Sequence, residues 1–205
     1  MQDNPRLGIA LMIATTVVFA AQDGISRYLA ENYNVITVVT IRYIFFMCFV
    51  LAYNSRQKGG IQQMASSDQL LLQIGRGLLL LAQICIAILS FSTLGLVNFH
   101  AVFASYPLMV MALSVPILGE AVGWRRWLAV CFGFCGVLLI LRPGTEMFSS
   151  ASILPVVAAF MMAIYGILTR YAARRDAAET SFFWTAMAGG IAMLCIGPFF
   201  WLQPV

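Results

Sequence analysis

Long apolar runs constrain this chain more than any other feature of its sequence. Seven of them are each about 20 residues long, the length at which a helix crosses a hydrocarbon core of roughly 30 Å. They lie near residues 7–28, 34–54, 70–92, 98–118, 124–141, 152–172 and 181–202. Backbone amides in lipid must be satisfied within their own segment, and no run alternates as a barrel strand would. The chain is therefore predicted to be an all-α membrane protein, a multi-span helical bundle with seven transmembrane helices.

The composition of the chain supports the same prediction. Hydrophobic residues make up 61% of the sequence and charged residues 10%, whereas soluble domains carry about 25% charged residues. The net charge of +4 therefore indicates no nucleic-acid partner, and the lipid bilayer is the expected partner of most of the surface. The five cysteines all fall inside apolar runs, without the paired spacing of a disulfide or a zinc site. We expect no metal and no cofactor.

The distribution of basic residues predicts the orientation of the spans. If the N-terminus is cytoplasmic, nine of the twelve Lys and Arg residues fall on the cytoplasmic side, where loops carry an excess of positive charge. These nine are Arg6, Arg56, Lys58, Arg76, Arg125, Arg126, Arg170, Arg174 and Arg175. We interpret Arg76, at the start of the third run, as a side chain that reaches back to that surface. The expected location is the inner (plasma) membrane, with several passes and a cytoplasmic N-terminus.

A short internal repeat bears on the architecture. Ser26-Arg27-Tyr28, near the end of the first run, recurs as Thr169-Arg170-Tyr171 near the end of the sixth, 143 residues later. The offset passes an odd number of spans, so the two copies would cross the membrane in opposite directions, as in the inverted repeats of many secondary transporters. We therefore expect residues 1–146 to form one complete five-helix repeat and residues 147–205 to contribute the first two helices of a second, inverted repeat.

Charged residues inside the runs are the first candidates for function, because each costs a few kcal/mol to insert. Asp23 and Arg42 are predicted to lie at matching depths in adjacent helices, where they would form an ion pair. Arg27, four residues after Asp23, is the competing partner. The pair would either fix helix packing or serve the solute, by binding the carboxylate and ammonium of a zwitterion or by forming an outer gate.

Four further polar residues are candidates for the solute site or its gating. His100, the only histidine, would lie about one turn inside the outer end of the fourth helix, where it is either a proton-coupling group or a hydrogen-bonded, non-titrating residue. Gln83, Tyr106 and Tyr165 are expected near the midplane of the membrane. Pro107 would bend the fourth helix beside Tyr106, and bent helices at the midplane are where transporters bind substrate. The alternative for Tyr106 and Gln83 is hydrogen bonding between helices.

The connection between the fourth and fifth runs carries a structural motif. Leu118-Gly119-Glu120 forms a short polar corner, followed by Trp124 and Trp127, which we interpret as anchors at the membrane interface. Gly133 and Gly136 lie on one face of the fifth helix, where small residues allow another helix to approach closely. The motif indicates two spans joined by a short turn at the membrane surface.

Together with Pro107 and Gly136-Val137, this corner resembles the repeat end of the EamA-domain family in the drug/metabolite transporter superfamily, the bacterial inner-membrane permeases and exporters. The resemblance covers residues 5–142 as one repeat and 152–202 as the start of a second. It implies a bundle of two inverted five-helix repeats around a central cavity, with alternating access and usually export of amino acids, metabolites or drugs. Because the expected last three helices are missing from the sequence, we expect either a C-terminally truncated chain or a bundle completed by another chain.

The predicted function is transport of a small-molecule solute across the membrane, without enzymatic activity. A retinal-binding receptor or pump would need a lysine in its last helix, and the only lysine is Lys58, between two runs. A hydrolase would need a nucleophile motif such as G-x-S-x-G to act with His100, and the sequence has none. The alternative that stays open is a non-transporting or half-size membrane subunit, which would have to assemble with another chain or form a homo-oligomer.

Overall fold

The computed structural model of the chain describes the backbone of residues 5–55, 60–119, 123–141 and 153–200, and nearly all of these residues are helical. The helices are α1 (Pro5–Asn32), α2 (Val35–Ser55), α3 (Gly60–Ala65), α4 (Leu70–Leu94), α5 (Leu96–Phe103), α6 (Tyr106–Leu118), α7 (Trp124–Leu141), α8 (Ile153–Ala172) and α9 (Ala178–Ile196), followed by the 3₁₀ helix η2 (Gly197–Phe200). The all-α prediction is confirmed for the described residues.

Within the described part of the chain, six helical segments are long and apolar enough to cross a membrane. They are Gly8–Asn32, Val35–Tyr53, Leu70–Leu94, Leu96–Leu118, Ile153–Ala172 and Ala178–Phe200. These segments match six of the seven predicted runs. The remaining run, at 124–141, forms α7, which is not one of the six, so its crossing of the membrane stays a prediction.

The fourth predicted run is not one continuous helix. α5 ends at Phe103 and α6 begins at Tyr106, and the backbone turns between them. Pro107 lies in the first turn of α6, where its missing N–H leaves no hydrogen bond unmade. In a continuous helix its ring would collide with the carbonyl group of Phe103. The predicted bend at Pro107 is thus present as a break just before the proline.

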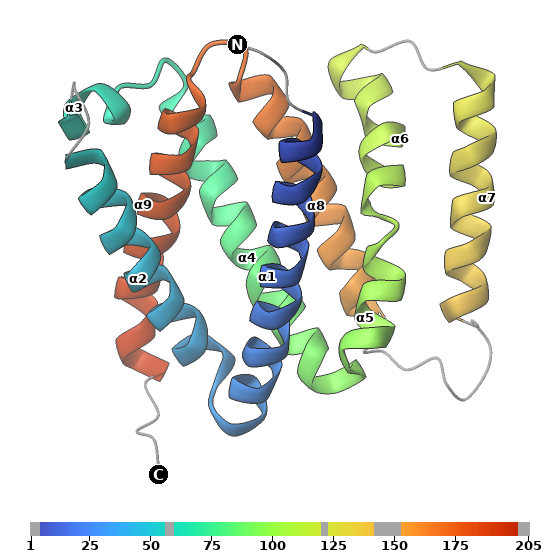
Figure 1. Cartoon of the computed structure of the whole chain (residues 1–205), viewed down its shortest axis with the longest axis horizontal. Coiled ribbons are helices and arrows are strands. Elements are labelled where there is room, and N and C mark those ends of the chain that lie inside the picture. Colours follow the sequence, from blue (N-terminus) through green and yellow to red (C-terminus); the bar gives the residue numbers. More distant parts are fainter. Residues whose placement is uncertain (1–4, 56–59, 120–122, 142–152, 201–205) are drawn as a thin grey trace.

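The helices run up and down in alternation, so that successive connections lie at opposite ends of the bundle (Figure 1). The start of α1, the short helix α3 and the α8–α9 turn lie at one end, which we call the N-terminal end of the bundle (Figure 1). α1 runs away from this end and α8 runs toward it. Their opposite directions are those that an inverted repeat requires, while the repeat itself and its boundary at residue 146 stay predictions.

α4 lies at the centre of the packing. It contacts α8 and α9 along its length, while α2 packs on α9 and α6 packs on α8. The close approach of α4 and α9 depends on Gly77, because a Cβ atom at this position would lie 2.9 Å from the Cβ atom of Ala188. Gly189 of α9 in turn faces the ring of Tyr43 on α2. Small residues therefore allow the three central helices to come together.

The predicted corner before α7 is described only in part. Gly119 ends α6 in the left-handed conformation, with φ of 71°, and its N–H donates to the carbonyl group of Val115. A glycine is the residue that adopts this conformation without strain, which explains its place in the motif. Glu120 lies outside the described residues.

α7 lies at one edge of the bundle, beside α6 (Figure 1). Trp124 and Trp127 at its start are both exposed, at 68% and 42%. Gly133 faces the side chain of Leu108 on α6, whereas a Cβ atom at Gly136 would meet no described atom within 4 Å. Only Gly133 therefore lies at a helix contact, and the anchoring role of the two tryptophans stays a prediction.

Candidate functional site

A cavity of about 970 Å³ lies between α1, α2, α4, α8 and α9 and reaches the α8–α9 turn. Its size falls at the upper end of the range for small-molecule sites, roughly 300–1,000 Å³. Along α4 the lining extends from Arg76 to Ile84, which is about 12 Å at the helical rise of 1.5 Å per residue. The polar and charged lining residues are Gln22, Arg42, Tyr43, Arg76, Tyr165, Thr169, Asp176, Ser181 and Thr185.

Arg76 is the central polar residue of this cavity and is only 1% exposed. One terminal nitrogen donates to the Tyr165 hydroxyl at 3.2 Å and to Thr169 Oγ1 at 3.1 Å, and the guanidinium lies 5.2 Å from the Tyr165 ring centroid. The other terminal nitrogen donates to the side chains of Gln73 and Thr185 and to the Ser181 carbonyl group. Hydrogen bonds to a buried guanidinium are among the stronger ones in proteins, and here they hold α4, α8 and α9 together.

The prediction that Arg76 reaches the membrane surface is wrong. α4 begins at Leu70, so Arg76 lies nearly two turns inside the helix, and acceptors on α8 and α9 surround its guanidinium. A charge in an apolar run was visible in the sequence, and its cost in lipid made it a candidate. Its acceptors are single hydroxyl and carbonyl groups on helices far along the chain, which no spacing in the sequence reveals.

Asp176, in the turn between α8 and α9, ties that turn to the start of α4. Its carboxylate accepts hydrogen bonds from the Ser67 hydroxyl at 2.6 Å, the Asp68 backbone N–H at 3.1 Å and the Gln73 amide at 2.8 Å. Desolvation acts against the charged form, but the hydrogen bonds outweigh it and lower the pKa of the Asp176 carboxyl below its usual value. We call these contacts the Asp176 clamp. Gln73 connects the clamp to Arg76, because its amide oxygen accepts from that guanidinium.

Arg42 lies on α2, on the wall of the same cavity, and is partly buried. It forms no hydrogen bond and no ion pair with any residue that the structure describes, although the charge of Asp23 attracts it at longer range. Beside it, Tyr43 and Phe46 meet edge to face with ring centroids 6.2 Å apart, and Phe46 meets Phe182 of α9 at 5.2 Å. Among the described residues, the cavity therefore combines an unpaired cation with an aromatic wall.

The ion pair predicted between Asp23 and Arg42 is not formed. Asp23 Oδ2 instead lies 3.2 Å from Nε2 of His100 on α5. The preceding residue, Gln22, lines the cavity, and one residue along a helix is a rotation of about 100°, so Asp23 projects in another direction and does not line it. Arg27 does not compete for Asp23 either, because its Nε donates to Glu31 at 2.9 Å.

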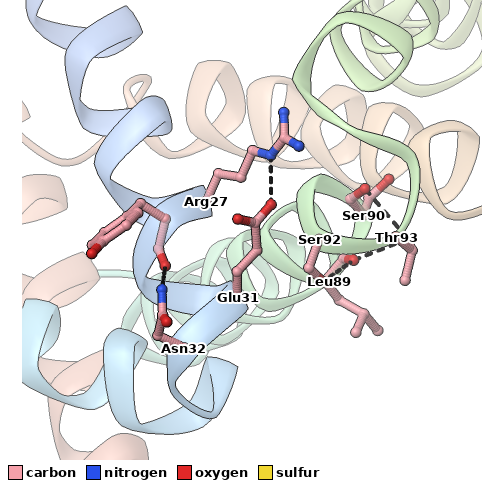
Figure 2. A network of polar contacts seen from close by, with 8 residues as sticks. Arg27, Glu31, Asn32, Leu89, Ser90, Ser92 and Thr93 are labelled. Atoms are coloured by element: carbon pink, nitrogen blue, oxygen red, sulfur yellow. Dashed lines mark hydrogen bonds and ion pairs between the residues drawn. The ribbon is translucent and has the colours of Figure 1, made fainter.

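Figure 2 shows the Arg27–Glu31 pair on α1, close to the last turn of α4. On α4, the Thr93 hydroxyl donates to the carbonyl groups of Leu89 and Ser90, and the Ser92 hydroxyl donates to that of Leu89 (Figure 2). Each bond drawn in this view stays within its own helix. The polar groups bonded in this view are thus satisfied within their own helices and do not line the cavity, whereas the buried Ser90 hydroxyl has no partner among the described residues.

The structure brings two of the six predicted solute-site residues, Arg42 and Tyr165, into the cavity. Gln83 is buried on α4, but it does not line the cavity. Tyr106 packs against Phe103 with the rings tilted and their centroids 5.3 Å apart, at the break between α5 and α6. Asp23 and His100 form their own pair beside α5. The sequence reasoning missed the small polar groups around Arg76, because serine and threonine are common in membrane helices and carry little signal alone.

Comparison with known proteins places these features in a family. The model of the EamA-like transporter family matches residues 6–142. An S-adenosylmethionine uptake transporter of Rickettsia felis is 26% identical over 197 residues, which cover 96% of this chain and 66% of that protein. A riboflavin transporter of Vibrio cholerae is 26% identical over 183 residues, which cover 88% of this chain and 61% of that protein.

The chain thus spans about two thirds of the length of the curated relatives that it matches first, 66% in the case of the Rickettsia protein. A second riboflavin transporter, from Rhizobium johnstonii, is 30% identical over 98 residues, or 45% of this chain and 32% of that protein. These relatives are transporters rather than enzymes. No solved structure gives a significant match to the chain.

Proposed function

Because this chain belongs to the EamA-like transporter family, we propose that it forms the solute pathway, or part of it, of a membrane transporter for small organic solutes. The observation that carries the proposal is the cavity between α1, α2, α4, α8 and α9. It lies among segments long and apolar enough to span a membrane, and it combines charged, polar and aromatic side chains. Sites that bind small molecules are of this kind, with a largely apolar wall and a few polar groups that fix orientation.

The names of the relatives suggest the first solutes to test. S-adenosylmethionine and riboflavin each carry a flat heteroaromatic ring system with a polar chain. The edge-to-face cluster of Tyr43, Phe46 and Phe182 offers a surface on which such a ring could pack, because aromatic faces prefer offset or edge contacts with other rings. The direction of transport is proposed as uptake rather than the export that the first resemblance implied, since the Rickettsia relative is named an uptake transporter.

The proposed mechanism is alternating access between two inverted repeats, of which residues 1–146 form the first and residues 147–205 belong to the second. Under this assignment α4 belongs to the first repeat, and α8 and α9 belong to the second. The Asp176 clamp then joins the two repeats at the N-terminal end of the bundle. It would have to open when the cavity opens to that side.

The orientation that we propose has the N-terminus in the cytoplasm and the protein in the inner membrane. The N-terminal end of the bundle carries the α8–α9 turn with Arg174 and Arg175, and α7 begins at the same end with Arg125 and Arg126 (Figure 1). An excess of basic residues marks the cytoplasmic side of membrane proteins. Reaction of single cysteines in this turn with an impermeant thiol reagent in intact cells would overturn the orientation.

Uptake of radiolabelled S-adenosylmethionine and riboflavin into vesicles that contain the purified protein tests the function. We expect uptake above that of empty vesicles, and we expect Leu80→Trp, which places an indole in the cavity wall, to reduce it strongly. Leu138→Trp on the exposed side of α7 is the matched control and should leave uptake unchanged. Equal uptake by both variants and the parent protein would show that the cavity is not the pathway.

A second candidate is a non-transporting or half-size subunit that assembles with another chain. The observation that favours it is the 66% coverage of the first relatives, because the transport activity of those proteins belongs to a longer chain. Native mass spectrometry of the purified protein, combined with the uptake assay, separates the candidates. A dimer that transports supports a half-size subunit, whereas an assembly without uptake of either solute supports a non-transporting one.

A further inference from the structure

The charged groups on the wall of the cavity do not balance. They are Arg42, Arg76 and Asp176, two cations and one anion. The carboxylate of Asp176 is already engaged by three hydrogen-bond donors from the start of α4. No described carboxylate lies within ion-pair distance of either arginine. The cavity therefore has an excess of positive charge in a region of low dielectric constant, where an unpaired charge is costly.

The two arginines differ in what they have left to bind. Arg76 donates from both terminal nitrogens to groups of the protein, and only its Nε, which is buried, lacks an acceptor among the described residues. Arg42 has all its donors unused by the described residues. The nearby carboxylate of Asp23, which attracts it at longer range, is paired with His100. The planar guanidinium of Arg42 can thus receive an acid in a bidentate manner.

We propose that Arg42 binds an acidic group of the solute, a carboxylate or a phosphate, while the body of the solute packs on Tyr43, Phe46 and Phe182. This inference rests on the proposed transport function and specifies its substrate class: an acid with an aromatic or apolar body. Of the two test solutes, S-adenosylmethionine carries a carboxylate and fits this class, whereas riboflavin has no carboxylate or phosphate and does not. The acidic group neutralises the excess charge of the cavity. The aromatic side chains lie next to Arg42 along α2 and across on α9, so one solute can contact both.

A thiol-labelling experiment tests the proposal and does not require that the solute be identified first. The five native cysteines are replaced by serine or alanine, and Ile84→Cys is introduced on the cavity wall that α4 forms, at a residue outside the proposed binding surface. The protein is reconstituted in vesicles, and the introduced thiol is labelled with methanethiosulfonate reagents that are anionic, cationic or neutral. The labelling rate with the neutral reagent measures the access of solvent to the thiol. The rates with the anionic and cationic reagents, each divided by the rate with the neutral reagent, therefore report the charge of the cavity.

We expect the anionic reagent to react about tenfold or more faster than the cationic one, because a focused positive potential raises the local concentration of anions by such factors. Arg42→Gln should lower this ratio severalfold, and Arg42→Lys, which keeps the charge, should retain most of it. Arg27→Gln is the matched control, because it removes an equal charge from an exposed residue that does not line the cavity. Because salt screens a charge outside the cavity, the ratio of anionic to cationic labelling rates should be unchanged in the Arg27→Gln protein.

Protection of the introduced thiol identifies the acid. Benzoate is compared with benzamide, and phenyl phosphate with phenol, as pairs that differ in the acidic group. We expect the acids to slow labelling by the neutral reagent more than their neutral partners do, and the more protective of the two acids indicates carboxylate or phosphate. The proposal is overturned if Arg42→Gln leaves the anion preference unchanged, or if the neutral partners protect as well as the acids.

The outcomes also separate this proposal from the transport function. If the anion preference is missing while uptake into vesicles persists, Arg42 is not the acid-binding residue and the transport function stands. If the preference depends on Arg42 while the vesicles take up neither test solute nor any protecting acid, the site binds acids but the transport proposal fails.

Discussion

Replacing Arg76 by lysine is expected to destabilise the protein more than replacing it by methionine. Both terminal nitrogens of Arg76 donate, and together they make five hydrogen bonds to groups on α4, α8 and α9. A lysine ammonium has three donors, so at least two of these five contacts are lost, and a buried acceptor left without any partner costs about 1–3 kcal/mol. The lysine also keeps the buried charge, for which the described residues offer no carboxylate within ion-pair distance.

Methionine removes the charge together with the donors. Thr169 and Thr185 keep a partner, because their hydroxyl groups already donate to the carbonyl groups of Tyr165 and Ser181. Replacing a buried ion pair or triad by apolar side chains is often close to neutral, and removing the charge of Arg76 takes no ion-pair partner from a described carboxylate. We therefore expect a loss of about 2–5 kcal/mol for the lysine variant and about 0–2 kcal/mol for the methionine variant. Each kcal/mol corresponds to a shift in Tm of about 2–4 °C at this chain length.

Thermal unfolding in detergent, followed by far-ultraviolet circular dichroism, measures the difference between the two variants. Arg126→Lys, on an exposed residue at the start of α7, is the control and should stay within about 0.5 kcal/mol of the parent protein. A methionine variant clearly less stable than the lysine variant would refute the reasoning, because the charge and the three donors that lysine retains would then stabilise the fold more than an apolar side chain does.

Three further substitutions test other parts of the structure. Asp176→Asn should cost about 1–2 kcal/mol at neutral pH, as the loss of a helix cap does. The pKa of Asp176 is lowered from 3.8, so its contribution to the free energy of unfolding is present above that pH and is lost as the pH falls through the folded-state pKa. The Tm values of the parent protein and the variant should therefore converge in acid. A gap between them that stays constant with pH would contradict the clamp. Gly77→Ala should lower the Tm by the equivalent of about 1–3 kcal/mol because its Cβ would lie 2.9 Å from that of Ala188, while Gly75→Ala, with no atom within 4 Å, should not lower it. Gly119→Ala, at φ of 71°, should cost about 1–2 kcal/mol in the same assay, and no loss would mean that the corner can relax.

The sequence was sufficient to predict the spans because their signal is local. Each apolar run is long enough to be recognised by itself, and α1, α2, α4, α8 and α9 all lie where the runs placed them. The break before Pro107 is a local effect as well, and the proline marked it. Its exact position could not be predicted, because the choice between a bent and a broken helix depends on how α5 and α6 pack on α8.

The partners of the polar residues could not be predicted, because they depend on helix rotation. Depth along a helix can be counted from the sequence, and on depth alone Asp23 and Arg42 match. A rotation of about 100° per residue decides whether Asp23 or Gln22 faces the cavity, and only the packing of α1 fixes it. The same limit applied to Arg76, whose acceptors Thr169 and Thr185 lie about a hundred residues further along the chain.

Blocking the cavity at position 84 is the most direct test of the central claim, that the solute passes between α1, α2, α4, α8 and α9. The Ile84→Cys protein without its native cysteines is modified to completion with a bulky thiol reagent, and uptake of S-adenosylmethionine and riboflavin into vesicles is compared before and after modification. Phe132→Cys on the exposed face of α7 is the control. We expect modification to abolish uptake by the Ile84→Cys protein and to leave uptake by the Phe132→Cys protein unchanged. Uptake that persists after complete modification of the thiol at position 84 would contradict the account.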